Sequence, residues 1–365
     1  MYIYILLLLY LIVLTLILNV DDNRIHKNKK ENLYFIILAF IPIIIISGLR
    51  SPEIGVDTQQ FVNAFNKIKY MSISDFSSLR YEYGFSFLCW ALSKISSEPQ
   101  ILIFTTSLII NYSVAEFIYK NSKNVYLSTI LYLICNFFFS NMNIMRQALA
   151  ISIVLLGYEK LKNAQYLKFI GFVIIASQFH SSAILSLLYI PLKKFKFTKK
   201  SSIIVLFATV LAFLLGRELF EILARFSTRL YDYMDSNFTV ENYFGSLLDF
   251  LVYFISFLFG IFILSNQKKS IETADMKEVS DIIGNMGFAV IFSVMIMRVI
   301  LFNRFTPYFT IFMIIWLPNC LKLIKNGKDR LMLSVLVVFA FCLYWVIIMI
   351  YRPEWYGVIP YKFCF

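Results

Sequence analysis

The segment FIGFVIIASQFHSSAILSLLYIPL, residues 169–192, is apolar except for a short polar break around His180. Crossing the hydrocarbon layer of a bilayer takes about 20 mostly apolar residues in one helix. The break divides this stretch into two pieces of roughly 11 residues, each about 16 Å long and too short to cross alone. We therefore expect a membrane-embedded helix that breaks at residues 178–182.

Apolar runs of similar length recur along the whole chain. The 365 residues are 59% hydrophobic and 15% charged, and the mean hydropathy is +0.73, which excludes a soluble globular domain. The short alternating segments of a membrane β-barrel are absent from the sequence. We expect an all-α, polytopic membrane bundle of about 10–12 transmembrane segments in a single domain, residues 1–365. The apolar segments lie near residues 1–20, 33–49, 85–97, 101–119, 125–142, 147–161, 168–192, 201–216, 248–264, 282–300, 305–321 and 331–351.

Charge predicts the orientation of these segments. The net charge of +12 resides mainly in short loops such as KKFKFTKK, residues 193–200, and lysine-rich short loops stay in the cytoplasm. We therefore expect a multi-pass membrane protein with its basic loops in the cytoplasm, and no nucleic-acid partner. The first apolar segment lacks the basic start and small-residue cleavage site of a signal peptide, so we interpret it as a permanent helix. Two long connections, residues 50–84 and 217–247, carry nearly balanced charges and are expected outside.

The number of crossings leaves two arrangements open. If every segment crosses, Lys120, Lys123, Lys162 and Lys168 lie outside. If residues 85–97 lie along the interface and residues 168–192 enter and return, all four lysines lie inside, in agreement with the charge rule. We prefer the second arrangement, which places His180 deep, near the base of a pocket that opens to the outside.

The polar break is the first candidate site. An ionisable side chain inside a bilayer is costly and usually faces a cavity or a partner, so His180 either lines a cavity with Gln178 and Ser181 or bridges two helices as a structural clamp. Asp57 and Glu82, in the first long loop, are further candidates. Each has an ordinary alternative, Asp57 as a helix N-cap and Glu82 as an acid favoured by a helix dipole.

Four arginines are predicted at one membrane face although none lies in a basic loop. Each alone could be an interfacial anchor. Together they can hold a diphosphate, because the guanidinium fork matches phosphate oxygens two at a time and does not deprotonate. The set comprises Arg50, Arg146, Arg298 and Arg304, with Gln147 and Asn303 beside two of them as candidate substrate contacts.

Several other chemistries have no signal in the sequence. A GxxxxGK[ST] phosphate loop and an HExxH pattern are both missing, and the five cysteines are scattered without metal or redox spacing. We expect no metal and no cofactor.

Five short motifs together resemble the EpsG-like branch of the Wzy polysaccharide polymerases, from about residue 33 to residue 310. They are GLRSPEIGVDTQQF (48–61), YEYGF (81–85), NIMRQALAISIVLL (143–156), FHSSAIL (179–185) and NRFTPYF (303–309). The resemblance implies an enzyme of O-antigen, capsule or exopolysaccharide synthesis. Its donor and acceptor are undecaprenyl-diphosphate-linked oligosaccharides at the outer side of the cytoplasmic membrane, and its partners include a flippase and a chain-length regulator.

The resemblance also implies a metal-independent transfer of glycan from the lipid diphosphate to a sugar hydroxyl. The arginines would stabilise the departing diphosphate, and His180, Asp57 or Glu82 would accept the hydroxyl proton. Two other functions remain open: a lipid-linked oligosaccharide flippase, and a membrane O-acyltransferase or O-antigen ligase acting on the same glycans.

Overall fold

The computed structural model describes residues 1–18, 29–196, 198–225, 243–267 and 273–365. These residues form helices and contain no strand, only one isolated β-bridge between Arg50 and Phe363. The all-α polytopic fold is confirmed. Most of the predicted loop 217–247 lies outside the described residues.

The described residues form two compact units within what the sequence led us to expect as a single domain. The first unit comprises residues 1–184 and 331–365, and the second comprises residues 185–330.

The first unit is built from the nine α-helices α1 to α9, the 3₁₀ helices η1 and η5, the start of the 3₁₀ helix η2 and most of the long helix α17. Their bounds are α1 Tyr2–Leu18, α2 Lys29–Gly48, α3 Thr58–Ile68, η1 Ile73–Ser78, α4 Tyr83–Ser93, α5 Gln100–Asn121, α6 Val125–Ile134, α7 Phe137–Asn143, α8 Met145–Lys162, α9 Tyr166–Ser177, η2 Ser181–Leu188, α17 Gly327–Tyr351 and η5 Pro353–Trp355. The boundary between the units falls inside η2 and inside the first turn of α17.

The second unit contains long helices and a broken C-terminal part. Its elements are α10 Tyr189–Leu192, α11 Lys199–Ala224, α13 Tyr243–Ser265, α14 Ala274–Ile296, η4 Ile300–Arg304, α15 Thr306–Thr310 and α16 Met313–Lys322. Its core is aromatic: Trp316 is fully buried and donates from Nε1 to the Ser256 carbonyl at 2.9 Å.

Six helices among the described residues are long and apolar enough to cross a membrane: α2, α5, α11, α13, α14 and α17. A seventh span results if α6 and α7, which meet at a bend of 53°, are counted as one. The bend follows from Asn136, whose φ of 64° lies in the left-handed region that asparagine tolerates. Fewer helices qualify than the sequence led us to expect, because α1 and α9 are short and α8 carries four charged residues.

Hydrogen bonds show which ends of the first unit's helices lie together. Gln100 Nε2, at the start of α5, donates to the Gly48 carbonyl at the end of α2 at 2.7 Å. At the opposite end, Lys162 Nζ donates to Asn121 Oδ1 at 2.9 Å, and Tyr119 Oη reaches the Lys29 carbonyl at 3.5 Å. Residues 49–99 therefore leave and return at one end, as the second of our two arrangements expects of residues 85–97.

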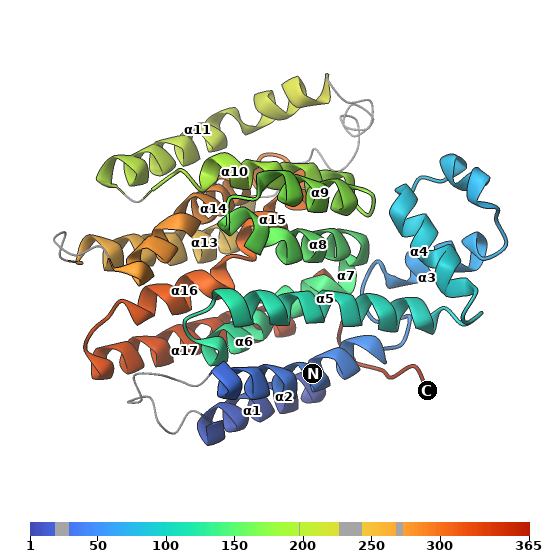
Figure 1. Ribbon diagram of the computed structural model, residues 1–365, viewed down its shortest axis with the longest axis horizontal. Coiled ribbons are helices and arrows are strands. Elements are labelled where there is room, and N and C mark those ends of the chain that lie inside the picture. The colour runs from blue at the N-terminus through green and yellow to red at the C-terminus, as the bar shows by residue number, and fades with distance from the viewer. Residues whose placement is uncertain (19–28, 197, 226–242, 268–272) are drawn as a thin grey trace. The chain divides into compact units, whose positions relative to one another are not determined.

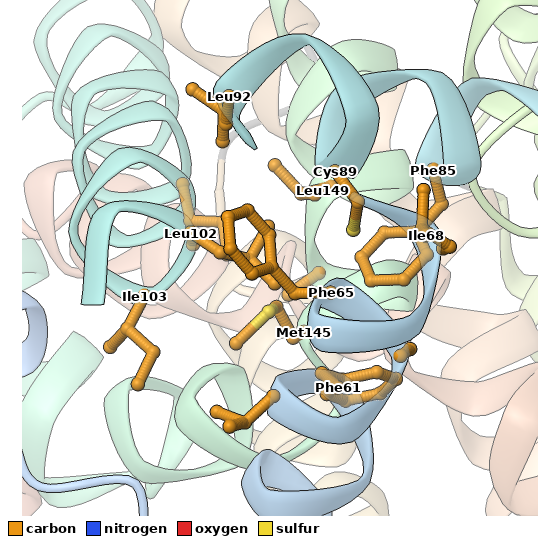
Figure 2. Packing of buried hydrophobic residues seen from close by; sticks show 14 of the residues in the cluster. Phe61, Phe65, Ile68, Phe85, Cys89, Leu92, Leu102, Ile103, Met145 and Leu149 are labelled. Atoms are coloured by element: carbon orange, nitrogen blue, oxygen red, sulfur yellow. The ribbon is translucent and has the colours of Figure 1, made fainter. Parts of the chain in front are cut away.

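Residues 49–99 form a helical hairpin, α3 and α4, beside the N-terminal end of α5 (Figure 1). The two helices bury Phe65 and Cys89 against Leu102 of α5 and Met145 of α8, in a shared apolar cluster (Figure 2). This core packs the hairpin against the first turn of α8. The predicted external loop 50–84 is therefore a packed structure.

Candidate functional site

Glu82 joins three segments of the first unit. It stands at the N-cap of α4 in an extended conformation. Its Oε2 forms an ion pair with Arg146 Nη1 in the first turn of α8, and its Oε1 accepts from the Ser181 backbone N–H at 3.3 Å. The two paired side chains are only 12% and 19% exposed for Glu82 and Arg146. One carboxylate thus connects α4, α8 and the break after α9.

Three aromatic rings surround the Arg146 guanidinium. Its Cζ lies 5.0 Å from the centroid of Tyr81, 5.7 Å from Phe61 and 5.8 Å from Phe85. Rings at this range attract a cation and restrict its side-chain conformers. We call Phe61, Tyr81 and Phe85 the aromatic cage. It holds Arg146 beside Glu82.

The predicted break after α9 is present. The helix ends at Ser177, the Gln178 carbonyl accepts from the Phe85 N–H at 3.2 Å, and His180 Nδ1 lies 2.6 Å from Ser182 Oγ. We expected His180 to lie deep. It is half-buried within the protein. It lies near the level of Arg146 and not deeper, because Glu82 binds both the first turn of α8 and residue 181.

The close approach of α4 to the break depends on Gly84. A Cβ at this position would lie 2.8 Å from both the Cβ and the carbonyl oxygen of Gln178. Real side chains do not come this close, so a larger residue would push the start of α4 away from the break.

Electrostatics keep Glu82 ionised. Burial on its own would raise the pKa of Glu82, but the Arg146 guanidinium, backbone N–H groups and His180 together hold that pKa below its ordinary value. The contribution of His180 shows that the imidazole lies within electrostatic range of the carboxylate. Glu82, Arg146 and His180 therefore form one cluster.

Arg50 occupies a different environment. It is 1% exposed, its Nη1 donates to the Ser47 carbonyl and to Ser107 Oγ at 3.0 Å, and its Nη2 donates to the Met142 carbonyl at 3.1 Å. Ser47 and Met142 lie near the C-terminal ends of α2 and α7, where helix dipoles favour a cation. Arg50 therefore clamps two helix ends together.

The chain's last residues hold the loop that carries Arg50. Ser51 N–H donates to the Lys362 carbonyl and Cys364 N–H to the Leu49 carbonyl, both at 2.9 Å, and Tyr361 Oη donates to the Ile46 carbonyl at 2.8 Å. Figure 1 shows this segment beside the end of α2. The sequence of residues 356–365 did not lead us to expect that they would hold the loop that carries Arg50.

The remaining predicted residues are distributed over both units. Asp57 occupies the N-cap position of α3 without a side-chain capping hydrogen bond, Gln147 is buried next to Arg146, and Gln178 is exposed. In the second unit, Arg298 lies over the Phe213 ring at 5.6 Å, and Asn303 and Arg304 lie in η4.

The aromatic cage is the part of the site that we missed. Its three rings belong to two of the quoted motifs, DTQQF and YEYGF, but the chain contains 38 Phe and 23 Tyr, which obscures any single aromatic. Only the acidic residue at position 82 and the arginine at position 146 gave a signal.

A comparison with known protein families gives a match that contains the residues of this cluster. The EpsG family matches residues 33–363, which includes the hairpin, the cluster and the C-terminal segment. The chain belongs to the EpsG family. The resemblance is confirmed, and the match extends past residue 310 to the C-terminal segment that holds the Arg50 loop.

A curated relative of this EpsG-family chain is the amylovoran biosynthesis protein AmsC of Erwinia amylovora, which is 24% identical over 208 residues. The aligned region covers 54% of this chain and 55% of AmsC, about half the length of each. No solved structure shows a significant match. Within the described residues, no three His, Cys, Asp or Glu side chains come together in a way that could hold a metal ion.

Proposed function

We propose that this EpsG-family chain is a polysaccharide polymerase that transfers a glycan from undecaprenyl diphosphate to a sugar hydroxyl of another lipid-linked repeat unit. The relation to a protein named for amylovoran biosynthesis supports this role. The observation that carries it is the Glu82–Arg146–His180 cluster at one end of the first unit, in which the Glu82 carboxylate pairs with Arg146 and accepts from the backbone N–H of Ser181, the residue after His180.

Arg146 is the group we assign to the departing diphosphate. In the transfer, the bond from the anomeric carbon to the diphosphate oxygen breaks and its electron pair stays on the diphosphate. A guanidinium already fixed in position stabilises that charge without reorganisation. The aromatic cage and Glu82 supply the fixation.

His180 is the base we favour over Glu82. The acceptor oxygen bonds to the anomeric carbon while its proton passes to a base, and a base works best when its pKa lies near the operating pH. The lowered pKa of Glu82 makes it a weak base, so its role is to hold Arg146 and the 181 backbone. Ser182 fixes the imidazole at Nδ1, and we assign proton acceptance to Nε2. Asp57 remains a rival base.

The other predicted residues have secondary roles in this proposal. Arg50 positions the loop that leads to Asp57, since its donors are engaged by helix-end carbonyls. Gln147, Gln178 and Ser181 flank the cluster as substrate contacts. Arg298, Asn303 and Arg304 stay proposed diphosphate or substrate ligands of the second unit, to be tested by their own substitutions.

The proposed location follows from charge. Lys29, Lys120 and Lys162 lie at the end of the first unit opposite the cluster, and lysine-rich ends stay in the cytoplasm. The cluster then faces the outer side of the cytoplasmic membrane. There it would receive repeat units from a flippase and work beside a chain-length regulator.

A reconstituted assay tests the proposal. The purified protein, without added metal and then with it, is supplied with lipid-linked repeat units, and the expected product is a ladder of longer lipid-linked glycans. Single repeat units that change leaflet without growing would establish the flippase instead. Glycans that gain an acyl group, or that are moved to a different acceptor, would establish the acyltransferase or ligase.

A further inference from the structure

The hairpin of α3 and α4 has two outward faces of different chemistry. Both helices bury an apolar face in the same cluster, with Phe61, Phe65 and Ile68 from α3 and Phe85, Cys89 and Leu92 from α4 (Figure 2). The side chains that point away from that cluster are not needed for its packing. Their polarity therefore indicates whether each outward face meets water or lipid.

The outward face of α3 is polar. Gln59, Asn63, Asn66 and Lys67 are exposed, and Gln59 Nε2 donates to Asn63 Oδ1 at 3.2 Å. A face of amides and a lysine at helical spacing is typical of a helix in water.

The outward face of α4 is aromatic. Tyr83, Phe87, Trp90 and Lys94 follow one another at spacings of four, three and four residues, which places them on one side of a helix. Phe87 is 47% exposed and its ring stacks on that of Trp90 at 5.9 Å, while Lys94 Nζ lies 4.9 Å from the centre of the Trp90 ring. Trp90 itself is half-buried and forms the edge of this face, where it also packs against the cluster. Ile95 beyond them is 76% exposed. Aromatics with a lysine beside them are typical of a helix at a membrane surface.

The position of α4 along the chain sets its depth. Residues 94–99 link it directly to α5, a candidate membrane span that starts at Gln100. Gln100 also binds the last turn of α2, a second candidate span. Two spans thus end within a few residues of α4, and Figure 1 shows α4 beside that end of α5.

We propose that the Tyr83–Phe87–Trp90–Ile95 face of α4 rests in the lipid headgroup layer while the polar face of α3 stays in water. An interfacial helix buries its apolar face about 5–10 Å into the boundary of headgroups and acyl chains. Glu82 caps this helix and binds Arg146, so the cluster lies at the depth of lipid phosphates. A lipid-linked diphosphate then reaches Arg146 without leaving the bilayer, a consequence that rests on the proposed function.

Spin labels test the membrane contact independently of activity. Phe87→Cys and Asn66→Cys are each labelled in the full chain after Cys342→Ser and Cys364→Ser, since the other three cysteines are buried. The protein is reconstituted in vesicles of phosphatidylethanolamine and phosphatidylglycerol, and relaxation by oxygen is compared with relaxation by a water-soluble nickel chelate. We expect oxygen to dominate at residue 87 and nickel to dominate at residue 66.

Equal relaxation of both labels by nickel would overturn the proposal, and Ile95→Cys repeats the test at a second position.

The activity arm compares Phe87→Asn with Asn66→Ser. We expect Phe87→Asn to raise KM for the lipid-linked substrate with kcat unchanged, and Asn66→Ser to alter neither. If Phe87→Asn weakens binding of a lipid-free oligosaccharide while the label reports water, the face binds sugar and the proposal fails. If no polymerisation is detected at all, only the proposed function fails, because the labels still decide the membrane contact.

Discussion

Arg50 and Arg146 belong to the same unit, yet their guanidinium groups meet opposite kinds of partner. Arg50 is enclosed by two helix-end carbonyls and a serine hydroxyl. Arg146 is partly exposed and meets a carboxylate and three aromatic rings. The sequence predicts one role for both, and the environments support the different roles proposed for them. Neutral acceptors around both terminal nitrogens of Arg50 suit a structural clamp, whereas the single carboxylate at Arg146 suits a cation that takes a further anion.

The largest effect is expected at His180, which belongs to the same cluster as Arg146. His180→Gln should lower the polymerisation rate by about 10²- to 10⁴-fold, because it removes the proton acceptor. The assay is product formation from lipid-linked repeat units, with His26→Gln as the control, since the chain has two histidines. A wild-type rate for His180→Gln would assign the base to Asp57 or Glu82.

Arg146→Lys sharpens the comparison next. Lysine keeps the charge but loses the planar fork and its fit between the rings, so we expect kcat to fall by about 10²-fold with little change in unfolding temperature. Arg50→Lys should instead lower the unfolding temperature. If the two variants behave alike in both measurements, the distinction between clamp and ligand is wrong.

The difference between the two arginines also shows what the sequence could predict. Apolar length predicted the helices, because backbone groups in hydrocarbon must bond within their own segment, and the break at residues 178–182 appeared as expected. Pairing between distant segments could not be predicted in the same way. Arg50 and Arg146 both interrupt apolar surroundings, and only the carbonyls of residues 47 and 142 or the carboxylate of Glu82 tell them apart.

Packing inside the loop 50–84 was equally hidden. Asp57, as an N-cap, predicted a short helix, which α3 confirms. The burial of Phe61 and Phe65 against residues of α4, α5 and α8 depends on contacts far apart in sequence. For that reason the sequence showed the two motifs that contain the rings of the aromatic cage, but not that these rings meet around Arg146.

A stability measurement tests the clamp itself. Arg50→Gln should lower the free energy of unfolding by about 3 kcal/mol, because the buried carbonyls at residues 47 and 142 lose their donors. Denaturant unfolding in detergent measures this. Arg217→Gln is the matched control, since that arginine is exposed and, among the residues that the structure describes, pairs with Glu221 one helical turn away. If Arg50→Gln keeps full stability but loses turnover, Arg50 acts with Arg146 on the substrate.

Two glycines test how tightly the cluster is assembled. Gly84→Ala should cost about 1–3 kcal/mol of stability and reduce turnover, because its Cβ overlaps Gln178 and moves Glu82 away from residue 181. Gly171→Ala in α9 is the control, since nothing lies within 4 Å of a Cβ there. Equal behaviour of the two variants would mean that α4 need not touch the break.

The smallest effect concerns the pH dependence of the Glu82–Arg146 pair. The pKa of Glu82 is lower in the folded protein than its ordinary value, which is about 4.3 for a free glutamate. A lowered pKa stabilises the fold above the ordinary value, and the stabilisation is lost as pH falls through the folded pKa. Wild type should therefore unfold at a higher temperature than Glu82→Gln above pH 5, and the gap should close on acidification. A gap that widens instead would mean a raised pKa, and Glu82 would then be a proton donor rather than the anchor of Arg146.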